Sequence, residues 1–368
     1  MAKSGRRLLV VAVLICLVAC GGDPKDADPI PSHEVEAPSR AEQSQDLVDL
    51  HSNADGPGCS AAVAQQGQVV WRGAQGLADL ESKTAITPDA VFDIGSVSKQ
   101  FTAAAVLLLQ DAGRLRLQDP LADYLSSFPP WSETTTLDHL MHHTSGIPAY
   151  EPLLQDQGFE LTDRTTQAQT VEVLGAVRKL EFTPGSDWAY SNSNYVLLGE
   201  VVRRVSGQTL PQYLKVNVFD PLELDMVVEP TAAIPGKALS YQGSAPQFEV
   251  VDYQWEQVGD GAIQTTPTEL ARWGDNYRTG EVGGRKWLDA VLEGAAKGPP
   301  GLAGETARYG AGIVQGENGE LAHVGAWEAF VTGFWVSPDR ATSLAFSCNR
   351  ASDALALLAS LSSIWSTS

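Results

Sequence analysis

The sequence predicts an α+β fold with a five-stranded antiparallel sheet that both ends of the folded chain build together. Two short apolar runs, 61–64 and 69–72, flank a Gly-containing turn, which indicates a β-hairpin. Strand-like runs with short connections, among them 309–315 and 330–336, return between 309 and 347, as in an antiparallel meander. The section 115–287 is mostly helical, with Pro and Gly in its loops. The economical arrangement is one sheet flanked by helices, with a helical region inserted between its two parts.

Length and composition indicate a globular protein. The chain has 368 residues, of which 43% are hydrophobic and 19% charged, enough for one large domain or two smaller ones. Its formal net charge of -20 would repel a phosphate backbone, so we expect no nucleic-acid partner. Its four cysteines show no CxxC spacing, which argues against a disulfide-rich scaffold and against a zinc ribbon.

The first twenty residues predict an export signal that ends in a lipidation site. A basic N-terminus precedes an unbroken apolar run, 8–19, which is too short to span a bilayer comfortably. The run stops at Cys20, which small residues flank, and so resembles a bacterial lipobox, whose cysteine is lipidated and becomes the mature N-terminus. An ordinary secretory peptide is the alternative. We expect a signal peptide over 1–19 and an exported lipoprotein of the bacterial cell envelope, anchored to a membrane through Cys20.

A tether and one folded domain are expected to follow the lipidation site. Proline, acidic and small polar residues dominate 20–45, and no aliphatic stripe is present there, which predicts a disordered tether. We expect one domain over 46–368. Its sheet region comprises 46–95 and 285–368, and its helical region comprises 96–284.

Apolar patterning places the principal helices. Residues 101–109 are apolar on all sides, which predicts a buried helix, and Gly113 follows as its C-cap. Further helices are expected at 170–180, 195–205 and 268–277. An amphipathic helix over 354–365 is long enough to cover one face of the sheet.

Three short motifs contain residues suited to chemistry, and the first is Ser96-Val97-Ser98-Lys99 at the start of the buried helix. Residues three apart share a helix face, so the Lys99 amine can reach the Ser96 hydroxyl. Free N–H groups at a helix N-terminus favour developing negative charge. A desolvated lysine can activate a serine as a nucleophile. Ser98 is the less favoured nucleophile, because its side chain points away from that of Lys99.

The second motif, Tyr190-Ser191-Asn192, follows a Gly-containing turn and precedes a helical pattern. A phenol can relay a proton when nearby cations lower its pKa from about 10. Asn192 offers both a donor and an acceptor to an acyl amide. The alternative interpretation is a helix N-cap beside a packed tyrosine.

The third motif, His323-Val324-Gly325-Ala326, lies in a predicted strand. Glycine weakens a strand unless another backbone or a ligand must approach closely. The N–H groups of Ala326 and Ser96 can then form an oxyanion hole. The alternative is an ordinary histidine at the end of a strand.

In their order and context, the three motifs resemble those of the serine β-lactamase-like, penicillin-binding superfamily, which uses S-x-x-K, then Y-x-N or S-x-N, then K-T-G or H-T-G. The closest branch contains class C β-lactamases, D-alanyl-D-alanine carboxypeptidases, D-aminopeptidases and related esterases. Supporting segments include LDHLMHHTSGIP at 137–148 and TPGSDWAYSNSNYVLLG at 183–199. The resemblance covers about 45–365 and implies a β-lactamase/transpeptidase-like fold.

The resemblance implies a role for each matching residue. Ser96 would be the acylated nucleophile, and Lys99 with Tyr190 would shuttle its proton. Asn192 would bind the acyl side-chain amide, and His323 would help to orient Tyr190 and the leaving group.

The resemblance also implies where an oxyanion would be held. The N–H groups of Ser96 and Ala326, beside Gly325, would bind it. The family needs no cofactor, and the three histidines within 137–148 have no accompanying ligand pattern, so we expect no metal site.

The third motif departs from the family pattern, because Val324 stands where the family has Thr, and Glu328 follows nearby. His323 is largely uncharged near neutral pH and Val324 has no donor, so a substrate carboxylate would be held poorly. We therefore expect a serine hydrolase that cleaves an ester or amide of a small-molecule or peptide substrate, of esterase or D-peptidase type, through an acyl-enzyme on Ser96. One alternative is a β-lactamase or D,D-carboxypeptidase. An alternative of another class is a catalytically silent envelope-binding protein.

A disulfide is suggested by the same resemblance. Cys59 begins the first strand and Cys348 ends the last, and the family's sheet places these two strands side by side. An exported protein meets oxidising conditions, so Cys59 and Cys348 can form a disulfide. Two free thiols are the alternative.

Overall fold

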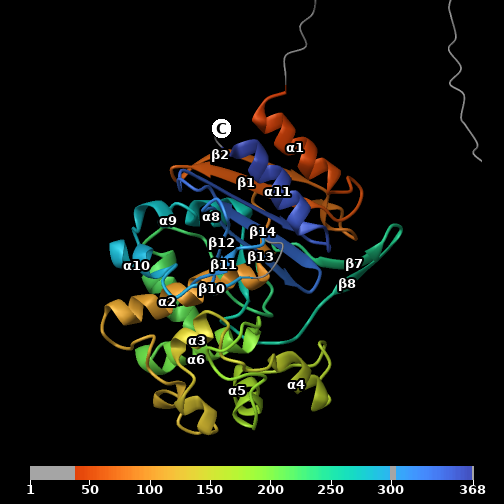
Figure 1. Cartoon of the computed structure of the whole chain (residues 1–368). Coiled ribbons are helices and arrows are strands. Elements are labelled where there is room, and N and C mark those ends of the chain that lie inside the picture. Colours follow the sequence, from red (N-terminus) through yellow and green to blue (C-terminus); the bar gives the residue numbers. More distant parts are fainter. Residues whose placement is uncertain (1–37, 299–303, 367–368) are drawn as a thin grey trace, which may run out of the picture. The chain divides into compact units, whose positions relative to one another are not determined.

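Both ends of the folded chain contribute strands to one large antiparallel sheet (Figure 1). The computed structural model describes residues 38–298 and 304–366. Within these residues the sheet has eight strands, in the order β10-β11-β12-β13-β14-β15-β1-β2. The predicted α+β class and the contribution of both termini are confirmed, whereas the predicted number of five strands is wrong.

Five long strands form the centre of this sheet. They are β1 (Cys59–Gln65), β2 (Gln68–Gln75), β13 (Leu321–Trp327), β14 (Phe330–Val336) and β15 (Thr342–Cys348). β1 lies between β2 and β15, so the first and last long strands of the chain are neighbours.

Three two-residue strands extend the sheet at the β13 edge. They are β10 (Ala296–Lys297), β11 (Arg308–Tyr309) and β12 (Val314–Gln315). The stretch 309–315 was expected to be one strand. It turns back on itself instead, because Gly312 has a φ of 72° and the Gly310 N–H donates to the carbonyl of Ile313.

Two helices from opposite ends of the chain cover one face of the sheet (Figure 1). α1 (Arg40–Leu50) and α11 (Ala354–Trp365) pack there, and the Trp365 indole N–H donates to Ser44 Oγ at 2.9 Å. The predicted tether, 20–45, therefore ends earlier than expected. Ser39 and Glu42 form a reciprocal capping box that starts α1, and Val48 is buried under it.

The other face of the sheet packs on the main hydrophobic core. α2 (Lys99–Asp111) is buried on nearly all sides there, between the sheet and α6 (Asn192–Ser206). Its C-cap is Ala112, and Gly113 follows in the left-handed conformation with a φ of 66°. α8 (Pro267–Trp273) packs against β1 and β15. The helix expected over 268–277 is divided, because Gly274 separates α8 from α9 (Asn276–Thr279).

Shorter elements complete the helical region. The remaining helices are α3 (Leu137–Met141), α4 (Tyr150–Asp156), α5 (Gln167–Gly175), α7 (Leu210–Leu214) and α10 (Gly284–Ala290), with 3₁₀ turns η2 (Leu121–Asp123) and η3 (Pro130–Glu133) and the π-turn η4 (Lys215–Phe219). α5 thus ends before the predicted limit of 180.

Within the described residues, three small sheets lie outside the large one. β5 (Phe92–Asp93), β9 (Ile263–Thr265) and β6 (Val227–Val228) form one of them. The others are the pairs β3 (Leu77–Asp79) with β4 (Thr84–Ala85), and β7 (Ser240–Ser244) with β8 (Gln247–Val251). The strands β6, β7, β8 and β9 interrupt the region that the sequence predicted to be mostly helical.

A disulfide joins the two neighbouring strands that come from opposite ends of the domain. Cys59 and Cys348 are paired in the register of β1 and β15, and their sulfur atoms are bonded at 2.08 Å. The bond closes a sequence separation of 289 residues. Cross-links of this kind commonly stabilise a folded domain by about 2–4 kcal/mol.

The N-terminal predictions fall largely on residues that the structure does not describe. The signal peptide over 1–19, Cys20 and the tether as far as residue 37 lie outside the described residues. No helix within 38–298 and 304–366 is long and apolar enough to cross a membrane.

Candidate active site

Ser96 lies in a 3₁₀ turn, η1 (Gly95–Ser98), that leads directly into α2. The Asp93 carboxylate fixes the start of this turn by accepting the Gly95 N–H at 2.7 Å. Ser96 is half-buried and lines a cleft. Ser98 is buried instead, and its Oγ accepts the N–H of Ile263 at 3.2 Å. Of these two serines, only Ser96 therefore presents its hydroxyl to a ligand.

Lys99 is fully buried, and its Nζ lies within hydrogen-bonding distance of three oxygen atoms. Its Nζ is 3.0 Å from Ser96 Oγ, 2.7 Å from Asn192 Oδ1 and 2.7 Å from the carbonyl oxygen of Asp260. The amide and carbonyl oxygens can only accept, whereas a hydroxyl can accept or donate. Two positions on Nζ therefore serve the two obligate acceptors, and the third faces the Ser96 hydroxyl.

Asn192 and Tyr190 flank Lys99 from the start of α6. Asn192 accepts from Lys99 through Oδ1 and donates through Nδ2 to Glu151 Oε1. The Tyr190 ring lies 5.0 Å from Lys99 Nζ and stacks on the His143 ring, with 4.3 Å between ring centres. Tyr190 is 38% exposed, so one side of this residue faces solvent while its ring packs on His143.

His323 is buried beside the cleft rather than lining it. Its Nδ1–H donates to the Val324 carbonyl at 2.7 Å, which leaves Nε2 to accept from the Tyr309 hydroxyl at 3.1 Å. Burial, together with the Lys99 cation, lowers the pKa of His323 to about 3. The Tyr309 ring also meets Tyr190 edge-on. His323 is thus a neutral residue that contacts Tyr190 through Tyr309, and it cannot supply a cation to a substrate carboxylate.

The backbone of β13 meets the backbone of η1 at two glycines. A Cβ on Gly325 would lie 2.1 Å from the carbonyl oxygen of Ile94 and 2.9 Å from the Ser96 nitrogen. A Cβ on Gly95 would lie 2.8 Å from the Ala326 nitrogen. Both positions therefore exclude side chains, and this close approach brings the Ser96 and Ala326 backbones to the same cleft. Two backbone N–H groups so placed are suited to hold an oxyanion.

Val324 of the third motif and Glu328, which follows the motif, both lie away from the cleft. Val324 packs against the apolar cluster under α1 and α11, because successive strand residues face opposite sides of a sheet. Glu328 lines a separate hollow, where its Oε1 accepts the Tyr253 N–H at 3.0 Å. Burial raises the pKa of Glu328 to about 7. Neither side chain lines the cleft at Ser96.

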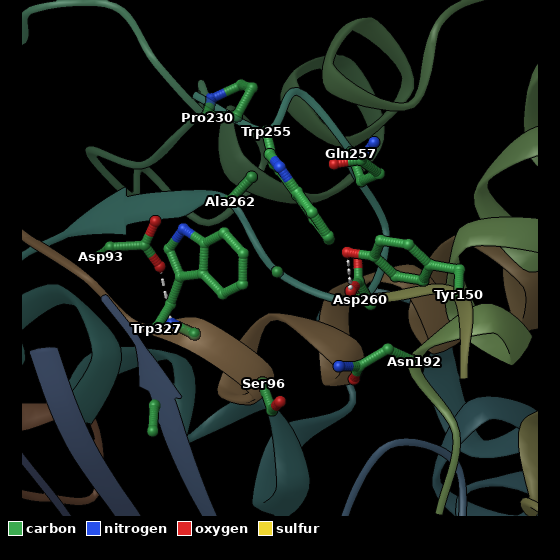
Figure 2. Close-up of a pocket in the computed structure, with 13 residues that line it drawn as sticks. Asp93, Ser96, Tyr150, Asn192, Pro230, Trp255, Gln257, Asp260, Ala262 and Trp327 are labelled. Atoms are coloured by element: carbon green, nitrogen blue, oxygen red, sulfur yellow. Dashed lines mark hydrogen bonds between the residues drawn. The ribbon is translucent and has the colours of Figure 1, made fainter. Parts of the chain in front are cut away.

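Side chains from outside the three sequence motifs form part of the walls of the cleft above Ser96 (Figure 2). The Trp255 ring centre lies 5.9 Å from that of Tyr150 and 6.4 Å from that of Trp327. Gln257 and Asp260 line the same side. These residues come from loops, from the start of α4 and from the end of β13, and none of them belongs to the three catalytic motifs.

The described lining residues give the cleft an acidic character. Asp93 and Asp260 are both buried there, and no lysine, arginine or histidine is among the lining residues. Burial raises the pKa of both carboxyl groups, that of Asp260 to about 6. Asp260 is thus mostly ionised at neutral pH, and its charge would repel a carboxylate that approached this wall of the cleft.

The histidines of 137–148 have structural contacts. His139 Nδ1 accepts the Thr136 N–H at the start of α3, and His142 Nδ1 bonds to the Asp138 carbonyl. His143 supports the Tyr190 ring. Within the part of the chain that the structure describes, no three His, Cys, Asp or Glu side chains group in a way that could hold a metal ion.

Comparison with known proteins gives a family for this fold and site. A family model described as Beta-lactamase matches residues 44–359. Esterase EstB from Burkholderia gladioli is 31% identical over 269 residues, which cover 68% of this chain and 68% of the esterase. A D-aminopeptidase from Gluconobacter oxydans is 28% identical over 226 residues, which cover 59% of this chain and 42% of the peptidase. The chain spans about half the length of the first curated relatives that it matches.

Solved structures show the same fold. The octameric penicillin-binding protein homologue from Pyrococcus abyssi has a TM-score of 0.74 at 23% identity, and the likeness covers 84% of this chain and 73% of that one. The family match extends over nearly all of the described residues and includes Ser96, Lys99 and Asn192. The chain belongs to the beta-lactamase family.

Proposed function

We propose that this chain is a serine hydrolase that cleaves an ester or amide through an acyl-enzyme on Ser96. The observation that supports this most directly is the placement of Lys99 Nζ 3.0 Å from Ser96 Oγ, with its other two contacts made to obligate acceptors. An alkyl hydroxyl needs such a proton acceptor to become a nucleophile. A silent binding protein has no need of a buried lysine held in this way.

The reaction follows from these positions. The substrate carbonyl oxygen binds at the N–H groups of Ser96 and Ala326, and Ser96 Oγ attacks the carbonyl carbon as its proton passes to Lys99 or, through it, to Tyr190. The leaving group departs with that proton, which leaves an ester on Ser96. A water then attacks this ester, gives up a proton to the same relay and releases the acid. The two backbone donors stabilise the oxyanion in both steps.

Substrates without a carboxylate beside the scissile bond are the expected class. Asp260, with a pKa of about 6, lies in the cleft, and His323 is neutral, so a β-lactam or a peptide ending in D-alanine would have its carboxylate repelled. The names of two relatives, an esterase and a D-aminopeptidase, support an ester or amide substrate. A β-lactamase or D,D-carboxypeptidase is the second candidate, because the chain belongs to the beta-lactamase family.

A comparison of kcat/KM for four substrates tests this assignment. We expect p-nitrophenyl butyrate and a D-amino-acid amide to react faster than a D-Ala-D-Ala peptide and a chromogenic cephalosporin, because only the latter pair has the carboxylate. A cephalosporin rate well above the ester rate would contradict the expectation. Labelling of the purified protein by a fluorophosphonate separates any of these enzymes from a silent binding protein.

We also propose that the protein is exported and anchored to a membrane of the bacterial cell envelope by a lipid on Cys20. The basic N-terminus, the apolar run 8–19 and the small residues around Cys20 support this. A disulfide between Cys59 and Cys348 is consistent with an oxidising compartment. The mass of the mature N-terminal peptide decides between a lipidated Cys20 and an ordinary signal cleavage.

A further inference from the structure

Gln257 has an unused hydrogen-bond acceptor at the cleft. The side chain is only 5% exposed and lines the space above Ser96. Its Nε2 donates to the hydroxyls of Thr170 at 2.8 Å and Thr165 at 3.1 Å, and it lies 3.4 Å from the Thr166 carbonyl oxygen. A carbonyl only accepts, so the nitrogen must face this side. Oε1 then faces the other way, toward Trp255 (Figure 2), and it has no partner within the described residues.

An unpaired buried acceptor costs free energy unless a ligand supplies a donor. The donor that this cleft favours is a charged one. Asp260 lines the same wall, with its carboxylate accepting the Tyr150 hydroxyl at 3.1 Å. Glu151 accepts from Asn192 through Oε1, while its Oε2 is buried and has no partner in the described part of the chain. Lys99, beneath them, is already held by three oxygens.

Aromatic rings complete the surroundings of this acceptor. Trp255 and Tyr150 pack against each other with 5.9 Å between ring centres, and both line the cleft. The Trp255 indole N–H donates to the Glu160 carbonyl oxygen at 3.0 Å. The ring therefore presents its face and its carbon edges to the cleft, and no free donor. Faces of Trp and Tyr attract cations, and the attraction grows when the cation is desolvated.

We propose that Gln257 and Asp260, between Trp255 and Tyr150, form a subsite for a primary ammonium group of the substrate. Gln257 Oε1 accepts one N–H bond of the ammonium, and the Asp260 carboxylate supplies its countercharge. A quaternary ammonium lacks the N–H that Oε1 requires, so the subsite selects a protonated primary amine. This inference depends on the proposed hydrolase activity and narrows its substrates to esters or amides of that class, such as amino-acid amides.

The subsite has a pH dependence with a defined sign. Burial raises the pKa of Asp260 to about 6, while Lys99 opposes the rise, Glu151 adds to it and Tyr150 donates to the carboxylate. Asp260 is therefore ionised above about pH 6 and neutral below it. The preference for an ammonium-bearing substrate is expected to be present above about pH 6 and to fall as the pH is lowered through that value.

A matched pair of anilides tests the subsite with the purified chain. Alanine p-nitroanilide, in D and L forms, differs from propionyl p-nitroanilide only by the ammonium group. The quantity to compare is the ratio of kcat/KM for the charged over the neutral anilide, at pH 7.5 and pH 5. We expect Gln257→Leu and Asp260→Asn each to lower this ratio about tenfold or more at pH 7.5, since a hydrogen bond to a charged group is lost.

Gln254→Leu is the matched control, because Gln254 lies on the same segment, is half-buried and does not line the cleft. Its ratio is expected to equal that of the unmodified chain. Gln257→Glu provides a second variant at the site, and it should retain or raise the ratio. A ratio that Gln257→Leu leaves unchanged, or that Gln254→Leu lowers equally, overturns the subsite.

Failure of the subsite and failure of the proposed function are distinguishable. Fluorophosphonate labelling of Ser96 reports the hydrolase independently of the anilides. Labelling with unchanged ratios refutes the subsite alone, whereas absence of both labelling and hydrolysis refutes the hydrolase and with it the subsite.

Discussion

Ser96→Ala is expected to abolish covalent labelling and to reduce ester hydrolysis by at least about 10³-fold, since no acyl-enzyme can form. The hydroxyl removed is half-buried and contacts Lys99 in the cleft, so the thermal unfolding midpoint should change little. Mass spectrometry of the labelled protein and a kcat/KM measurement check the two parts of this prediction.

Ser98→Ala is the matched control two residues away. Ser98 Oγ accepts the buried N–H of Ile263, so its loss should lower the free energy of unfolding by about 1–3 kcal/mol. Labelling of Ser96 should persist in this variant. An adduct on Ser98, or labelling that survives Ser96→Ala, would show that the nucleophile is misassigned.

Lys99→Met is expected to slow turnover by about 10²–10⁴-fold, the usual effect of removing a general base. Methionine keeps the unbranched apolar stem in its buried position but removes the only nitrogen within reach of Ser96 Oγ in the contacts described. The same change leaves Asn192 Oδ1 and the Asp260 carbonyl without their donor, so the unfolding midpoint should also fall. Single-turnover acylation kinetics separate the chemical effect from the loss of folded protein.

Lys237→Met is the control for this substitution. Its ammonium lies 5.7 Å from the Phe330 ring centre and lines the separate hollow that contains Glu328. The acylation rate should stay close to that of the unmodified chain. Equal losses in Lys99→Met and Lys237→Met would indicate a general effect of lost positive charge rather than a missing base.

The elements with a strong local pattern could be predicted from the sequence. The last helix has the predicted limits, and β14 also matches its expected range. The sequence predicted less accurately those elements whose limits depend on a single helix-capping residue or on a single residue in a turn. The capping box at Ser39 starts a helix in a segment whose composition indicated disorder, and Gly312 turns a stretch whose side chains favour a strand.

In the site, contacts between residues close in the sequence could likewise be predicted, whereas contacts that depend on tertiary packing could not. The spacing of Ser96 and Lys99 on one helical turn predicts their contact, which the structure places at 3.0 Å. A strand pattern shows that His323 and Val324 face opposite sides, but which side meets the cleft depends on packing partners far along the chain. Gln257 and Asp260 belong to no helix or strand, and only the folded chain brings them beside Asn192.

The bond between Cys59 and Cys348 makes a covalent ring of the chain between them, and this ring contains Ser96, Asn192 and Ala326. A protease that cuts an exposed loop inside the ring produces two polypeptides that remain joined through the two sulfur atoms. Both polypeptides keep their strands side by side at β1 and β15, so the parts of the cleft stay tethered to each other. A cut in such a loop is therefore an internal nick rather than the loss of half the site.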